Sequence, residues 1–275
     1  MPAVDCHAHA FNLARQGWGS DRGFDISPGE LGTAEQFLHL LSLHGFTHGV
    51  LINPLGGYGA NNTYMLEAIA AAKGRLKGVA LLPDGTPEAE IRRMVEGGIV
   101  GIRFNLDFPT SPPLHGEAGQ RSLARAREVG WMVQVHYHHN DSIVAAIPIL
   151  RAAGCPVLID HSGRPDLAMG LDQPGFQALL EFGRSSDAII KLSGLFRLTQ
   201  EGAPYHDTDP YIASLIEAFT LDRCIWGSDW PFLRAKHRTD FAPLLDALAR
   251  MIPDAADREK VLWDNPARIF RLTAD

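Results

Sequence analysis

The feature that most constrains this chain is a regular alternation of short apolar segments with longer segments of helical periodicity. Each of eight segments rich in Val, Ile and Leu is followed by a polar loop and then a helical pattern. Short apolar runs of this kind are typical of strands buried on both faces of a parallel sheet. The predicted strands are 4–7, 49–52, 78–82, 100–104, 132–136, 157–160, 188–192 and 224–226.

The intervening segments carry recognisable helix ends. Thr33, with Gln36 three residues later, predicts a capping box, and Gly45 lies where that helix should end. Pro87 fits the first turn of a later helix, and Pro148 should bend another. Beyond the helix that follows Thr33, the predicted helices are 64–73, 87–97, 120–129, 141–154, 174–182, 210–219 and 241–251.

Strands that alternate with helices along the whole chain indicate an α/β protein with a parallel sheet. Eight repeats favour a closed barrel over an open sheet, so the predicted fold is a single (β/α)8 TIM barrel. Such a barrel typically needs about 250 residues. The chain has 275 residues, and we therefore expect one domain over residues 1–275.

Composition limits the kind of partner. A formal net charge of −7 argues against a nucleic-acid surface, although local arginine clusters can still bind small anions. Three cysteines without paired spacing do not suggest a disulfide framework. No signal peptide and no apolar run of about 18–20 residues are evident, so we expect a cytoplasmic protein without a membrane partner. A homo-oligomer stays possible.

Polar residues collect at the ends of the predicted strands. Asp5, His7 and His9 alternate at the end of the first, and a period of two places all three on one side. A His-x-His pair at the barrel mouth can chelate a metal or donate to an oxyanion. Long loops at 10–32 and 193–209 lie at the same end and are typical of lids.

Three further strand ends carry His136, His161 and Asp229. Each alone could be a satisfied structural residue. Burying charge is costly, however, and buried charged groups are normally retained for pairing, metal binding or catalysis. The combined set therefore predicts an active site at the carboxyl ends of the strands, where TIM-barrel active sites lie.

Arginines lie at or just after the ends of the fourth, sixth and seventh predicted strands: Arg103, Arg164 and Arg197. Guanidinium groups bind carboxylates in a bidentate manner, so these residues predict an anionic substrate. Structural ion pairs or solvated loop charges are the alternative interpretation. His136 and its neighbour Tyr137 are further candidates for binding the substrate.

Several motifs together resemble the amidohydrolase superfamily, in the branch of 2-pyrone-4,6-dicarboxylate lactonases and sugar-acid lactonases. The resemblance extends from residue 4 to about residue 271. It rests on the Asp5-x-His7-x-His9 opening and the lone histidines that end the fifth and sixth strands. It also rests on the motifs IDHSGRPD at 159–166, KLSG at 191–194, GSDWP at 227–231 and NPARIF at 265–270.

The resemblance implies reversible hydrolysis of a lactone to a hydroxy acid. Asp229 would be the general base, and His7, His9 and His161 would polarise the lactone carbonyl and stabilise the oxyanion. The same resemblance implies that Arg103 and Arg197 hold substrate carboxylates. Two departures matter: Pro109 occupies the position of a second arginine in the pyrone-dicarboxylate pattern, and His136 stands where that pattern has a tyrosine.

The departure at His136 bears on metal binding. Three neutral imidazoles and one carboxylate suit Zn²⁺, so a single divalent ion on His7, His9, His136 and Asp229 is one hypothesis. In the rival interpretation, fixed hydrogen-bond donors replace the metal. A binuclear centre is not expected, because the fourth and fifth strands lack a bridging Lys or Glu at their ends. No organic cofactor is expected.

The leading functional hypothesis is hydrolysis of a small anionic or polyhydroxy lactone. A metal-dependent non-oxidative decarboxylase of an unsaturated or aromatic acid is the second, because the same superfamily contains such enzymes. An amide or phosphoester hydrolase is a third. A non-catalytic barrel that binds an anionic metabolite or a partner protein is the alternative of a different class.

Overall fold

The computed structural model describes residues 2–20 and 24–273, and its core is one sheet of eight parallel strands in the order β1 to β8. The sheet closes next to β1, where the amide of His9 donates to the carbonyl of Trp230 over 2.7 Å. All eight predicted strands are confirmed. They are β1 Val4–Ala8, β2 His48–Ile52, β3 Leu76–Ala80, β4 Ile99–Asn105, β5 Met132–His136, β6 Val157–Ile159, β7 Ile189–Ser193 and β8 Cys224–Gly227.

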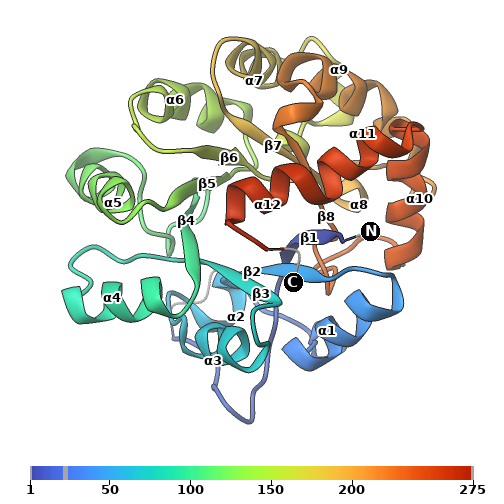
Figure 1. Ribbon diagram of the computed structural model, residues 1–275. Coiled ribbons are helices and arrows are strands. Elements are labelled where there is room, and N and C mark those ends of the chain that lie inside the picture. Colours follow the sequence, from blue (N-terminus) through green and yellow to red (C-terminus); the bar gives the residue numbers. More distant parts are fainter. Residues whose placement is uncertain (1, 21–23, 274–275) are drawn as a thin grey trace.

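Helices surround this barrel (Figure 1), which confirms the predicted (β/α)8 architecture. Eight of them match the predicted helices: α1 Ala34–Leu43, α3 Thr63–Ala71, α4 Glu88–Glu96, α5 Gly116–Val129, α6 Asn140–Arg151, α7 Pro174–Arg184, α9 Asp209–Phe219 and α10 Phe241–Met251. The capping box of Thr33 and Gln36 is present at the start of α1. The helix expected from residue 120 begins earlier, at Gly116.

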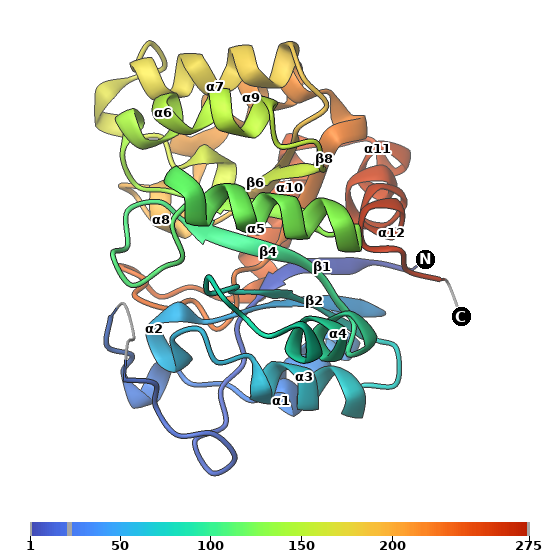
Figure 2. The same ribbon diagram turned by 90° about the vertical axis from the view of Figure 1, so that its left-hand side faces the viewer.

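Four short helices were not anticipated: α2 Leu55–Tyr58, α8 Leu195–Leu198, α11 Ala255–Glu259 and α12 Asn265–Phe270. Figure 2 shows that α2 and α8 lie at one end of the barrel, whereas α11, α12 and both chain ends lie at the other. Phe270 of α12 packs with the interior residues Val4 and Ile225, so this helix covers the amino-terminal end.

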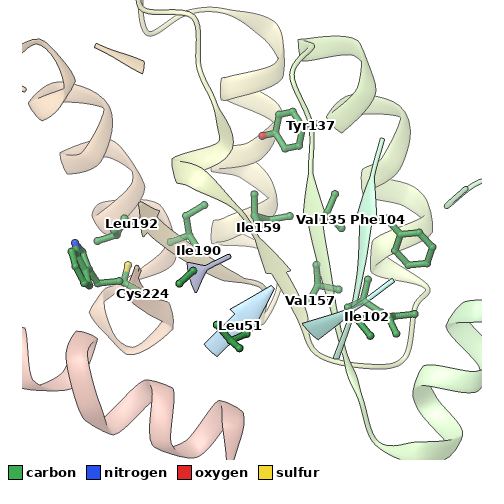
Figure 3. Close-up of a cluster of buried hydrophobic side chains, with 14 of the residues drawn as sticks. Leu51, Ile102, Phe104, Val135, Tyr137, Val157, Ile159, Ile190, Leu192 and Cys224 are labelled. Carbon is green, nitrogen blue, oxygen red and sulfur yellow. The ribbon is translucent and has the colours of Figure 1, made fainter. Parts of the chain in front are cut away.

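Alternation along the strands separates an outer apolar layer from the side chains of the barrel interior. Ile102 and Phe104 of β4, and Ile190 and Leu192 of β7, belong to the apolar layer beneath the helices (Figure 3). The residues between them, Arg103 and Lys191, therefore point into the barrel. This alternation brings charged side chains to the carboxyl half of the interior.

The register of β1 shifts against β2 between Asp5 and Ala8. Val4 and Cys6 pack together in the barrel interior, and the adjacent His7 also contacts interior side chains. The Asp5 carboxylate instead accepts hydrogen bonds from the Ser228 hydroxyl (2.5 Å) and the His7 amide (3.1 Å). The expected one-sided alternation of Asp5, His7 and His9 is therefore interrupted.

Among the described residues, no helix has the length and apolar character needed to cross a membrane.

Candidate active site

A cavity opens at the carboxyl ends of the strands. Its walls combine four arginines and four histidines with Asn105 and five apolar side chains, and no described Asp or Glu lines it. A cavity wall that carries guanidinium groups and no described carboxylate suits a negatively charged ligand. The lining residues are His9, Phe24, Pro54, Leu55, Arg103, Asn105, Phe108, His136, His138, His161, Arg164, Arg197, Leu233 and Arg234.

Asp229 is completely buried and lies against three of these lining residues. Its Oδ1 atom is 3.7 Å from Nε2 of His9 and 3.8 Å from Nε2 of His7. Its Oδ2 atom accepts a hydrogen bond from Nε of Arg197 and lies 3.8 Å from Nδ1 of His161. The four residues predicted to be catalytic, Asp229, His7, His9 and His161, therefore meet at one point.

Burial keeps these imidazoles neutral. It lowers the pKa values of His7 and His161 well below the ordinary value, and it lowers the pKa of His9 to about 4. A neutral imidazole offers one N–H donor and one lone pair. Nδ1 of His9 donates to the carbonyl of Ile52 over 2.9 Å, so Nε2 of His9 carries the lone pair, which suits a metal ion. A donor to an oxyanion then comes from His7 or His161.

A network of buried charged side chains packs against His7. Nδ1 of His7 lies 3.4 Å from Oδ1 of Asp160 and 3.1 Å from Nζ of Lys191. Asp160 also binds Nε of Arg103 over 2.9 Å, and Gln134 contacts both Asp160 and Lys191. Burial alone would raise the pKa of Asp160, but Lys191 and Arg103 together lower it below its usual range. Asp160 thus pairs with both buried cations, Arg103 and Lys191, next to His7.

The residues His7, His9 and Asp229 fit a single divalent ion. In tetrahedral coordination at about 2.0–2.1 Å, two ligand atoms lie roughly 3.3–3.4 Å apart. The Nε2 atoms of His7 and His9 are 3.4 Å apart, and Oδ1 of Asp229 is buried without a hydrogen-bond partner among the described residues. Oδ1 of Asp160 lies 3.4 Å from Nδ1 of His7, on the side of the ring where carboxylates commonly support metal-bound histidines.

A second potential group consists of His7, Asp160 and His161. Asp160 already pairs with Arg103 and Lys191, so the group that contains Asp229 is the more suitable one. His136, the remaining ligand in the sequence hypothesis, belongs to neither group.

His136 instead forms part of the cavity wall. Its ring packs edge-on against His161, with ring centroids 5.4 Å apart, and stacks on Phe108. The geometry therefore favours substrate contact for this residue. Tyr137, the residue after β5, points to the opposite side from His136, into the apolar layer with Val135 (Figure 3). Tyr137 does not line the cavity. The structure thus gives no support for substrate binding by Tyr137.

Three residues of the site have left-handed backbone conformations, which side-chain-bearing residues rarely adopt. The φ angles are 48° at His161, 45° at Arg164 and 62° at Asp229. Such strain costs on the order of 1–3 kcal/mol per residue and is concentrated at functional sites. The strained turns present His161 and Arg164 to the cavity.

The arginines divide into two kinds. Arg103 and Arg197, expected to bind substrate, are engaged by Asp160 and Asp229. Arg164, also expected there, lines the cavity and has no ion pair in the part of the chain that the structure describes. Sequence reasoning missed Arg234, as well as Phe24 and Phe108, because these residues lie on loops and not at strand ends.

A closed (β/α)8 barrel with a buried aspartate and a histidine cluster at its mouth defines a TIM-barrel hydrolase site. The chain belongs to the amidohydrolase family, whose sequence profile matches residues 4–272. This membership confirms the resemblance seen in the sequence.

Its relatives include lactone hydrolases. A 4-sulfomuconolactone hydrolase of Rhizobium radiobacter is 32% identical over 86% of this chain and 79% of the relative. A 2-pyrone-4,6-dicarboxylate hydrolase of Comamonas testosteroni is 29% identical over 98% of this chain and 90% of the relative. These relatives support the prediction that the chain is a hydrolytic enzyme.

A solved structure from Acinetobacter baumannii, described as a 2-pyrone-4,6-dicarboxylic acid hydrolase, superimposes with a TM-score of 0.87. It is 30% identical to this chain, and the alignment covers 99% of this chain and 100% of the other. That crystal contained bound citric acid.

Proposed function

We propose that this protein is a lactonase that opens an anionic lactone by attack of water on the ring carbonyl, with Asp229 as the general base. One observation carries the proposal. The buried Asp229 carboxylate presents an unpartnered oxygen to two neutral imidazoles, next to a cavity lined by arginines. A carboxylate and a set of fixed donors that share one cavity suit general-base attack on an acyl carbon.

In the proposed reaction, Asp229 takes a proton from water as the water oxygen bonds to the carbonyl carbon. The resulting oxyanion accepts hydrogen bonds from neutral imidazoles. The Oγ atom of Ser193 lies 3.1 Å from Nδ1 of His161, and its hydroxyl can donate a hydrogen bond to that nitrogen. The single proton of neutral His161 is then on Nε2, where it can be donated to the oxyanion. The tetrahedral carbon then releases the ring oxygen, which takes the proton from Asp229.

Arg197 would hold Asp229 in place during both proton transfers, because its Nε contacts Oδ2 and its Nη1 contacts the carbonyl of Leu233. His7, His9 and Asp229 would hold a divalent ion, for which zinc suits the donor set. When bound, such an ion supplies a Lewis acid that polarises the carbonyl.

Charge in the cavity supports an anionic substrate. The two curated relatives are named for lactones that carry sulfonate or carboxylate groups, and the solved relative binds citric acid, a tricarboxylic acid. In this chain, the cavity offers guanidinium groups and no described carboxylate. A carboxylated or sulfonated lactone therefore matches the site better than a neutral sugar lactone does.

A substrate panel tests the proposal. The purified protein is incubated with carboxylated pyrones, muconolactones and aldonolactones, while acid release and CO₂ release are followed in parallel. The proposal expects stoichiometric acid from a carboxylated or sulfonated lactone, without CO₂. CO₂ release would favour the decarboxylase alternative, and binding without turnover would favour a non-catalytic barrel.

A further inference from the structure

Two of the four cavity arginines form no ion pair in the part of the chain that the structure describes. Arg103 and Arg197 are held by Asp160 and Asp229. Arg164 and Arg234, in contrast, have no carboxylate within ion-pair distance among residues 2–20 and 24–273. Because the cavity wall also contains no described acidic residue, two guanidinium charges remain for a ligand.

The surroundings of Arg164 disfavour its positive charge. Its backbone has a φ of 45°, and burial lowers the pKa of its guanidinium to about 9. Isolating a cation from water is costly unless an anion compensates it. A ligand anion at this position would relieve a cost that the free protein carries.

Arg234 is held in the wall of the cavity without being neutralised. Its guanidinium carbon lies 5.1 Å from the centre of the Phe24 ring, in a cation–π contact. The Glu30 carboxylate accepts a hydrogen bond from the Arg234 backbone amide and fixes the chain there. Glu30 also attracts the guanidinium electrostatically, but the two side chains are not within ion-pair distance. Phe24, Leu233 and Arg234 together form one wall of the cavity.

The loop before α10 thus offers a prepositioned cation opposite an arginine from the segment after β6. The two guanidiniums line the same cavity. Burial and Arg197 are the main causes that lower the pKa of Arg164, and the charge of Arg234 adds to them. Two like charges that line one cavity repel each other, and an anion between or beside them would relieve that repulsion.

We propose that Arg234, acting with Arg164, is the specificity-determining residue for an anionic substituent of the substrate remote from the ring carbonyl. Arg103 and Arg197 are committed to holding Asp160 and Asp229. The substrate class is therefore a lactone that carries a carboxylate or sulfonate away from the reacting ester. This inference rests on the proposed lactonase function and extends it.

The test compares a carboxylated lactone with the same lactone in which the remote carboxylate is a neutral methyl ester. The variants are Arg234→Gln, Arg234→Lys and, as the matched control from the same loop, Arg238→Gln. Arg238 is exposed and pairs with Asp240, so its loss removes one positive charge outside the cavity.

A charge-assisted contact contributes about 1.5–3 kcal/mol, which corresponds to roughly 10- to 100-fold in kcat/KM. We expect Arg234→Gln to lower the preference for the carboxylated over the neutral substrate by that factor. Arg234→Lys should restore part of the preference, and Arg238→Gln should keep it. An equal fall on both substrates, or an unchanged preference in Arg234→Gln, would overturn the assignment.

Titration calorimetry with citrate separates this inference from the proposed function. Citrate should bind Arg234→Gln about 10-fold or more weakly than it binds the wild type or Arg238→Gln. Weaker citrate binding in Arg234→Gln without turnover of any lactone would reject the lactonase proposal but keep the anion subsite. Equal citrate affinities together with normal lactone turnover would reject the anion subsite but keep the lactonase proposal.

Discussion

Arg197 donates from Nε to Oδ2 of Asp229, whereas Oδ1 of the same carboxylate has no hydrogen-bond partner among the described residues. One oxygen is therefore anchored and the other is available to a water molecule or a metal ion. Arg197 comes from α8 and Asp229 follows β8, so the contact joins two segments of the barrel mouth.

The role of Asp229 is tested by Asp229→Asn, which keeps the shape of the side chain but cannot accept a proton from water. We expect kcat for lactone hydrolysis to fall by about 10²- to 10⁴-fold, with a much smaller change in KM. Steady-state assays measure both constants, and circular dichroism checks that the variant is folded. Retention of more than half of wild-type kcat would exclude Asp229 as the base.

Metal binding is tested by elemental analysis of protein purified without chelator. We expect about one divalent ion per chain, loss of activity in chelator and recovery when zinc is restored. His9→Asn should abolish the stoichiometric ion, whereas His206→Asn, at an exposed histidine, should keep it. Full activity in the chelator-treated, metal-free protein would contradict this prediction and favour the rival mechanism of fixed donors.

Asp160→Asn should destabilise the fold strongly. Asp160 is completely buried between Arg103 and Lys191, and its neutralisation would leave two buried cations without an anion. We expect the free energy of unfolding in urea to fall by about 3–5 kcal/mol. In Asp84→Asn, where the lost partner is the exposed Arg121, the same measurement should change by about 1 kcal/mol or less. Comparable losses in the two variants would disprove a structural role for the buried network.

Asp5 should make the stability depend on pH in an unusual direction. Burial, opposed by the hydrogen bond from Ser228, raises its pKa to about 7 in the folded protein. Between pH 4 and pH 7 the folded state then binds more protons at Asp5 than the unfolded state, so this residue's contribution to stability is lost as pH rises.

The comparison of wild type with Asp5→Asn isolates that contribution. The wild-type free energy of unfolding should fall relative to the variant by up to about 4 kcal/mol from pH 4 to pH 7. Urea titrations at several pH values measure the difference. A pH-independent difference would mean that Asp5 stays ionised, with an ordinary pKa, in the folded protein.

Much of this architecture is readable from the sequence, because each strand is a short Val-, Ile- or Leu-rich run between loops. The placement of Asp229, His9 and His161 at one point follows from a rule of the fold: strand ends of a closed barrel converge. The strand ends therefore predict which catalytic candidates meet, even though they are far apart in the chain.

Other features depend on three-dimensional detail. The register shift in β1 that turns Asp5 away from the cavity has no local sequence signal. Lys191 does have a local sequence signal, because a lysine between Ile190 and Leu192 in a buried strand requires a charged partner. The sequence does not show that this partner is Asp160. Arg234 lies on a loop, and only the fold of that loop places it in the cavity wall.

Hydrolysis in ¹⁸O-labelled water tests the central claim most directly. In a single turnover of a carboxylated lactone, water attack on the ring carbonyl places one ¹⁸O atom in the newly formed carboxylate and none in the new hydroxyl group. Tandem mass spectrometry of the hydroxy-acid product locates the label. We predict one labelled oxygen in that carboxylate; an unlabelled or isomerised product, or label in the hydroxyl group, would contradict the account.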